Sequence, residues 1–301
     1  MVLISQNITN IMNNIKVNQE KPENLKLLKS QRVIYAQAKN IYKWQLTLTI
    51  LIVIILNVIK IFQKDLFNAD ITSYITIVSI TITLLDLLFL SNLLSKKKTN
   101  AAKIQELFDC NIYGLEWNTT NSGEKPDNWT IEEAIPKYVE NHKAPITNWY
   151  HIDLNGLSQE EAILRCQKTN LEYDRKLRFL FKNDCTIFAV IIVILSFFVA
   201  TFIDASFKGY LTHFVSPSLP LIVILIKIIL DNQKAVKSLE EVRSAANKIC
   251  FDQNKLIIQN LRQVQDKLFC SRKDSVLIPE NYYIVRRSNL EKSTASNLSN
   301  K

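Results

Sequence analysis

Nineteen consecutive residues, "CTIFAVIIVILSFFVATFI" (185–203), carry no charged side chain. In a helix, which rises about 1.5 Å per residue, such a stretch spans most of the roughly 30 Å hydrocarbon layer of a bilayer. Three more stretches, 44–59, 71–94 and 209–226, are apolar over similar lengths, and Asp86 alone interrupts the second. The chain has four glycines and abundant Leu and Ile, which favours helices over barrel strands. The sequence therefore predicts an all-α membrane protein with four transmembrane helices in two hairpins.

The basic residues predict how these hairpins are oriented. The loops at 63–70 and 204–208 carry one lysine each, whereas residues 1–43, 95–184 and 231–301 carry 33 of the 37 Lys and Arg. Positive charge gathers on the cytoplasmic side of membrane proteins. We therefore expect both termini and the insert 95–184 to be cytoplasmic. The net charge of +9 then faces anionic lipid headgroups, and binding to a nucleic-acid polymer is not expected.

Five segments follow from this topology: an N-terminal arm and helix (1–43), a transmembrane hairpin (44–94), the insert (95–184), a second hairpin (185–230) and a C-terminal helix and tail (231–301). The helices before the first and third spans are expected to run unbroken into the membrane. The second of these opens with a capping box, Ser158 and Glu161.

The remaining polar segments have less regular patterns. Residues 231–270 contain neither Gly nor Pro, which predicts one long helix, although its heptad-like repeat slips at 256–257. Residues 108–157 are rich in turn formers and predict a small, mostly irregular cytoplasmic cap with a short strand near 110–115. The tail at 288–301 is expected to be disordered.

Motifs of known catalytic or metal sites are missing from the sequence. It contains no glycine-rich phosphate loop, H-E-x-x-H helix or G-x-S-x-G elbow. Its three histidines, His142, His151 and His213, do not group with a suitably spaced thiol. The five cysteines are scattered without a C-x-x-C pair and are expected to be free thiols. We therefore expect neither an enzyme nor a metal or cofactor.

The second span carries a stripe of hydroxyl side chains that ends at a carboxylate. Successive steps of four, three, four and three residues place five polar side chains within about 80° of one helical face: Thr72, Thr76, Ser79, Thr83 and Asp86. One interpretation is close helix packing, with Asp86 paired inside the bundle. The other is that the stripe lines a water-filled path.

Depth in the membrane suggests a partner for the carboxylate. Asp86 lies about 22 Å into the second span from its outer end, and Lys227 lies about 24 Å into the fourth, at about 1.5 Å per residue. We expect the two to pair near the cytoplasmic leaflet, with snorkelling of Lys227 to the interface as the alternative. Asn57 and Lys60 near the outer end of the first span would face a loop aspartate, Asp70 or Asp204. Two prolines should bend the fourth span.

Several stretches resemble one bacterial family over residues 22–290. They are "LLKSQRVIYAQAKNIYKWQ" (27–45), "LFDCNIYGLEWN" (107–118), "NWYHIDL" (148–154), "RCQKTNLEYDRKLR" (165–178) and "LIPENYYIVRR" (277–287). They are similar to the SMODS-associating four-transmembrane effectors, predicted pore formers of cyclic-oligonucleotide antiphage (CBASS) defence. The resemblance implies gating by a cyclic nucleotide from a partner nucleotidyltransferase. It also implies disruption of the bacterial inner membrane and death or arrest of the infected cell.

A cyclic oligonucleotide requires cations for its phosphates and flat side chains for its bases. The candidates are Arg165, Arg175, Arg178, Trp117, Trp129 and Trp149. Alternatively, these arginines pair with acidic residues of their own helix and the tryptophans fill the core of the cap.

Two functions from different classes remain open. The first is a ligand-gated pore formed by a homo-oligomer, because four spans per chain enclose little space. The second is a membrane-anchored interaction scaffold that conducts nothing. A small transporter is disfavoured, because no pair of discontinuous repeats is visible.

Overall fold

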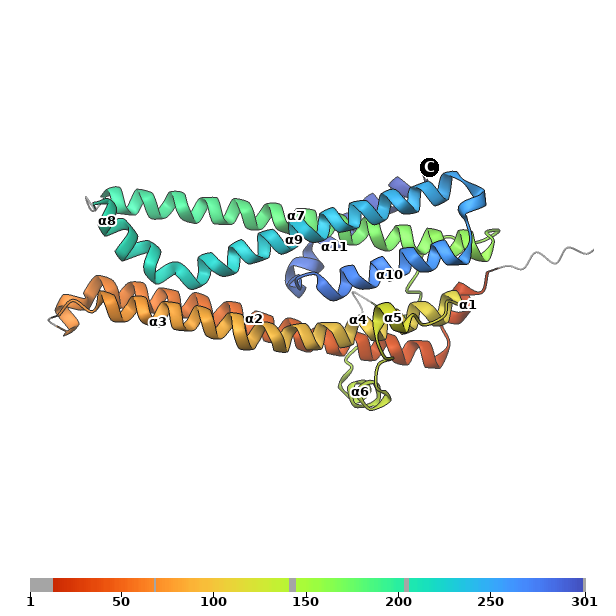
Figure 1. Ribbon diagram of the computed structural model, residues 1–301, viewed down its shortest axis with the longest axis horizontal. Coiled ribbons are helices and arrows are strands. Elements are labelled where there is room, and N and C mark those ends of the chain that lie inside the picture. Colours follow the sequence, from red (N-terminus) through yellow and green to blue (C-terminus); the bar gives the residue numbers. More distant parts are fainter. Residues whose placement is uncertain (1–12, 68, 141–144, 203–205, 300–301) are drawn as a thin grey trace, which may run out of the picture.

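The protein consists of two long helical hairpins that lie side by side in the computed structural model (Figure 1), which describes residues 13–67, 69–140, 145–202 and 206–299. The first hairpin comprises α2 (Pro22–Phe67), α3 (Thr72–Leu85), the π-helical η1 (Asp86–Leu90) and α4 (Ser91–Tyr113). The second comprises α7 (Gln159–Phe202), α8 (Phe207–Tyr210), the π-helical η3 (Leu211–Val215) and α9 (Ser216–Phe251). α2 packs along α4, and α7 packs along α9.

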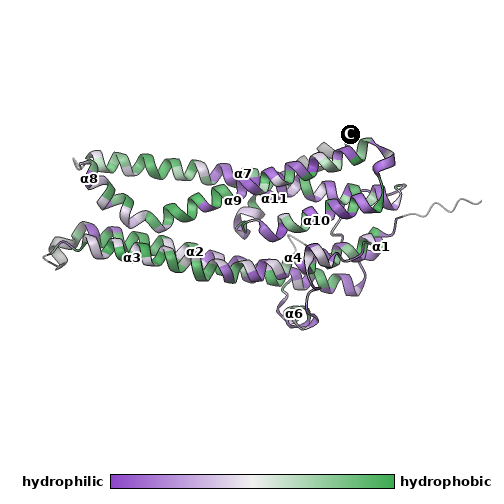
Figure 2. Ribbon diagram, viewed as in Figure 1, coloured by the Kyte–Doolittle hydropathy of each residue, from purple (hydrophilic) through white to green (hydrophobic). Residues whose placement is uncertain are grey.

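One half of this assembly is apolar along all four helices (Figure 2). Four helices are long and apolar enough to cross a membrane, which confirms the predicted spans. Their outward side chains are exposed, with Phe202 at 92% and Phe198 at 65%. Exposing this apolar surface to water would cost about 25 cal/mol per Å². Contact with the acyl chains of lipid avoids this cost. We call this end the membrane half and the other end the polar half.

Short helices and two longer ones complete the polar half around a hydrophobic core. The additional elements are α1 (Ile15–Gln19), α5 (Thr119–Ser122), α6 (Asn128–Ala134), η2 (Ile135–Lys137), η4 (Gln253–Lys255), α10 (Ile258–Asp274) and α11 (Glu280–Ser299). Leu28, Phe108, Ile163, Leu239 and Leu261 are among the fully buried side chains. Each such burial stabilises the fold by about 1.5–3 kcal/mol.

The predicted unbroken helices are present. α2 begins at Pro22 and α7 at Gln159, and both continue into the membrane half. The capping box at the start of α7 is also confirmed. The backbone nitrogen of Glu161 donates to the Ser158 hydroxyl (3.2 Å), while the Glu161 carboxylate accepts from the Ser158 backbone nitrogen (2.9 Å). Together these bonds satisfy two amide groups that would otherwise lack partners.

The prediction of a short strand near 110–115 is wrong. α4 continues to Tyr113 and ends on Gly114, whose φ of 70° lies in the left-handed region. Glycine adopts this conformation without a Cβ clash, and it is therefore a common helix stop. The β-branched and aromatic residues of this stretch instead occupy the buried face of the helix.

Two predictions for the C-terminal segment are also wrong. Residues 231–270 form two helices, because α9 ends at Phe251 and α10 turns back to pack on α9, α7 and α4. The heptad-like repeat slips at 256–257 because these residues lie in the turn that separates α9 from α10. The tail is helical as far as Ser299 rather than disordered, as the last part of α11. Residues 300–301 lie outside the described part.

Candidate functional site: a polar interface in the membrane half

Three spans meet through polar side chains in the membrane half. The hydroxyls of Thr76 on α3 and Ser216 on α9 are 2.7 Å apart. Nearby, the Asn57 amide on α2 donates to the Ser218 hydroxyl on α9 at 3.5 Å. These contacts place polar groups of α2 and α3 against the same stretch of α9. We call this region the polar interface.

The predicted hydroxyl stripe runs along this interface. Thr76, Ser79 and Thr83 each donate to the backbone carbonyl four residues earlier. Ser79 is fully buried, while Thr81 is exposed on another face of α3. The stripe therefore faces α9 within one chain, as the packing interpretation expects, and a water-lined path along it would require α9 to move.

The end of the stripe next to the loop is closed by a local turn. The Asp70 carboxylate accepts from the backbone nitrogen of Thr72 at 2.9 Å and from its hydroxyl at 2.5 Å. These bonds lower the pKa of Asp70. Thr72 therefore begins α3 as part of a cap.

Lys60 is the most unusual side chain of the interface. It lies one turn after Asn57 on α2 and is 2% exposed. Within the described part of the chain its ammonium has no hydrogen-bond partner. Asp70 acts on it electrostatically but forms no ion pair with it in the described structure, and Asp204 lies outside the described residues. Burying a charged group without a partner is costly, so this position requires a physical explanation.

Two π-helical segments flank the polar interface. η1 begins at Asp86, at the end of the hydroxyl stripe, and η3 immediately precedes Ser216. Pro217 and Pro220 follow in α9, and the chain bends sharply here toward α2 and α3 (Figure 1). The predicted bend is therefore present. π-helical turns insert an extra residue into a helix and are frequent at functional sites.

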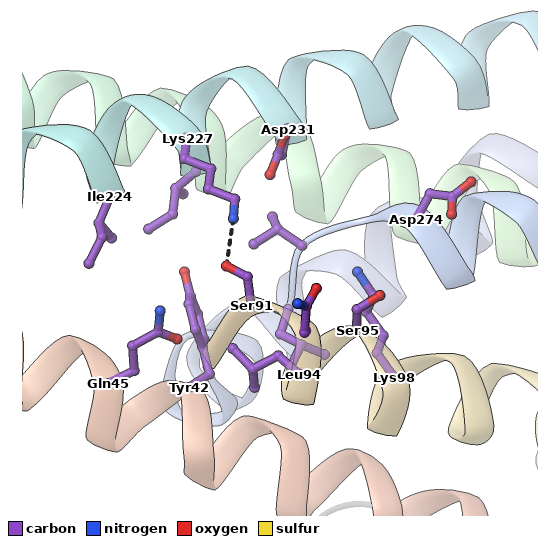
Figure 3. A pocket seen from close by; sticks show the side chains of 14 residues that line it. Tyr42, Gln45, Ser91, Leu94, Ser95, Lys98, Ile224, Lys227, Asp231 and Asp274 are labelled. Atoms are coloured by element: carbon purple, nitrogen blue, oxygen red, sulfur yellow. Dashed lines mark hydrogen bonds between the residues drawn. The ribbon is translucent and has the colours of Figure 1, made fainter. Parts of the chain in front are cut away.

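The predicted pair of Asp86 and Lys227 remains a prediction, because the side chain of Asp86 lies outside the described part. Lys227 donates to the Ser91 hydroxyl of α4 at 2.9 Å (Figure 3). Lys227 therefore reaches from the fourth span to the second. Its contact there, Ser91, lies about one and a half helical turns after Asp86.

A cavity lies where the membrane half joins the polar half (Figure 3). Its volume is about 320 Å³, at the lower end of small-molecule sites. Its lining includes Tyr42 of α2, Lys98 of α4, Lys227 and Asp231 of α9, and Asp274 of α10. Two lysines and two aspartates balance each other formally, and the charges of this cavity therefore do not select an anionic ligand.

Lys98 is the most perturbed of these groups and lies beyond the apolar stretch of its helix. Its ammonium donates to the Ser275 carbonyl at 2.7 Å. Burial lowers the pKa of Lys98 to about 8, with a smaller contribution from the positive charge of Arg178. The folded protein therefore holds this proton less tightly than the unfolded chain does.

The structure separates the predicted ligand-binding arginines by their partners. Arg175 pairs with Glu172 at 3.1 Å, and Arg178 pairs with Asp174 at 3.0 Å. Arg178 also donates to the Val276 carbonyl at 2.9 Å. These contacts match the alternative in which the arginines are neutralised within their own helix. Arg165 is half-buried and forms no described ion pair.

The three tryptophans lie in different environments. Trp149 packs edge-on against Phe108, with ring centroids 6.3 Å apart, at the margin of the core. The indole of Trp117 donates to the Gly123 carbonyl at 2.8 Å. Trp129 is 74% exposed and is thus the one of the three whose ring is mostly free to meet a partner.

Sequence reasoning missed a buried charge network in the polar half. Glu106 and Asp109 of α4 are fully buried, and they pair with Arg262 at 2.5 Å and Arg272 at 2.6 Å from α10. Gln265 donates to both carboxylates, at 2.8 and 3.1 Å. Burial and the neighbouring carboxylate raise the pKa of Glu106. The sequence could have indicated this network, because both acidic residues fall on the apolar face of α4.

Comparison with known proteins supports the family resemblance. The model of the SMODS-associating 4TM effector domain matches residues 13–300. A curated protein of Bacillus cereus (strain VD146), described as a probable CBASS effector molecule, is 27% identical over 277 residues, which cover 89% of this chain and 92% of that protein. No solved structure matches. The four membrane helices and the family match agree, and the chain belongs to the SMODS-associating 4TM effector family of multi-pass membrane proteins.

Proposed function

We propose that this antiphage membrane effector opens a pore when a cyclic oligonucleotide, made by a partner nucleotidyltransferase, binds to it. The polar interface is the observation that carries the proposal. Membrane interiors rarely contain polar side chains without a functional or packing role, and here polar groups of three spans gather on one contact. We propose that separation of α9 from α2 and α3 hydrates this contact.

The irregular segments of the helices provide places where such a movement can occur. A π-helical turn and two prolines weaken the backbone hydrogen bonding of the fourth span next to Ser216. We place the separated polar interfaces of several copies around one conducting path, because the four spans of a single chain enclose little space. We place both polar termini in the bacterial cytoplasm, as the positive charge of the polar half favours.

Release of a dye from liposomes tests this proposal. Purified protein is reconstituted and exposed to a panel of cyclic dinucleotides and trinucleotides, and we expect one of them to cause release. Thr76→Leu should reduce ligand-dependent release, because an apolar side chain in place of the hydroxyl makes hydration of the separated contact less favourable. Thr81→Leu on the exposed face of the same helix is the matched control and should leave release unchanged. Release that no ligand alters would refute the gated pore.

A non-conducting scaffold is the second candidate, and one observation favours it. The polar half exposes apolar side chains, with Phe251 at 85%, Val139 at 82% and Trp129 at 74%, which suits contact with another protein. In this case liposomes should stay sealed with every ligand, and Thr76→Leu should change only stability.

A further inference from the structure

We propose that Lys60 lines the conducting path when the pore is open and makes that path prefer anions. The inference rests on the proposed function and names the class of ion that passes. It starts from the burial of the Lys60 side chain, which is 2% exposed while its ammonium has no hydrogen-bond partner in the described part of the chain.

The position of Lys60 places its charge on the polar interface. Lys60 follows Asn57 by three residues, and side chains three apart share one face of a helix. Asn57 contacts Ser218 of α9, so Lys60 points toward the same helix, one turn closer to the loop end of the spans. α2 also contacts η3. Any opening that draws α9 away from α2 therefore exposes Lys60.

No carboxylate of the described residues forms a direct pair with the Lys60 ammonium. Asp70 is exposed at the loop and acts on Lys60 only through space, while its Oδ1 accepts from the backbone nitrogen and the hydroxyl of Thr72. The other described members of the interface are neutral amides and hydroxyls. A buried group without partners gains hydration when the contact opens, and the open state thus gains more from Lys60 than the closed state does. In a narrow path a fixed ammonium attracts anions and repels cations.

Reversal potentials in planar bilayers with a potassium chloride gradient measure this preference. The parent protein, activated with the panel of cyclic dinucleotides and trinucleotides, should pass chloride better than potassium. Lys60→Gln should lower the chloride-to-potassium permeability ratio about tenfold, which corresponds to about 1.4 kcal/mol. Lys60→Glu should invert the preference. Lys208→Gln, which removes an exposed lysine of α8 near the same end of the spans, is the matched control and should keep the parent ratio.

The possible results distinguish this inference from the proposed function. A parent current that prefers potassium, or a ratio unchanged in Lys60→Gln, overturns the role of Lys60 and leaves the pore intact. The absence of current with every ligand overturns the pore and the selectivity together. Parent-like currents in Lys60→Gln, with only the ratio altered, would show that the variant folds and that the charge itself sets the preference.

Discussion

The buried ion pair of Arg272 and Asp109 allows a quantitative test of how α10 is attached to α4. Asp109 is fully buried, and its carboxylate also accepts from Tyr150 at 2.9 Å and from Gln265 at 3.1 Å. Arg272→Met leaves this carboxylate with two neutral donors. Removing one partner of a buried pair costs about 3–5 kcal/mol, because the remaining charge is uncompensated.

Thermal melting of the purified protein in detergent measures this cost. At roughly 2 °C per kcal/mol for a domain of this size, Arg272→Met should melt at least about 6 °C below the parent. Adding Asp109→Asn should recover much of the loss, since the amide oxygen still accepts from Tyr150. Lys137→Met is the control, because its pair with Glu133 is exposed and should contribute under about 1 kcal/mol. If Arg272→Met melts within 2 °C of the parent, the pair does not hold α10.

Three further predictions concern single side chains. At pH 8 a maleimide should label the exposed Cys250 rapidly and Cys110 only after unfolding, because burial raises the pKa of Cys110 to about 12; rapid labelling of both, counted by mass spectrometry, would contradict the buried network. The folded pKa of Lys98, about 8, lies below its ordinary 10.5, so the folded state holds this proton less tightly than the unfolded chain. The melting temperature should therefore rise between about pH 8 and pH 10.5, and Lys98→Met should remove that rise; an equal rise in both proteins would exclude Lys98 as the cause. Thr76→Val should destabilise the membrane half by about 1 kcal/mol, since its hydroxyl partner on α9 loses a bond, whereas Thr81→Val should melt like the parent; equal melting temperatures for the two variants would contradict the contact.

The sequence by itself determined the membrane architecture of this protein. Long uncharged stretches have few alternatives to spanning helices, because backbone polar groups must be satisfied within the lipid. The hydroxyl stripe of α3 was predictable for a similar reason, since helical periodicity alone places Thr76, Ser79 and Thr83 on one face. The start of α7 followed from the local capping chemistry of Ser158 and Glu161.

Only the tertiary structure decided which groups meet across helices. Arg262 and Arg272 look like ordinary surface residues in the sequence, but the turn after Phe251 brings α10 back onto α4 and buries both beside carboxylates. Local patterns cannot fix that turn, because α9 and α10 each satisfy helical periodicity. The solitary charge of Lys60 is likewise a tertiary fact. The prolines predict the bend of α9, but its packing against α2 and α3, which buries Lys60, is visible only in the structure.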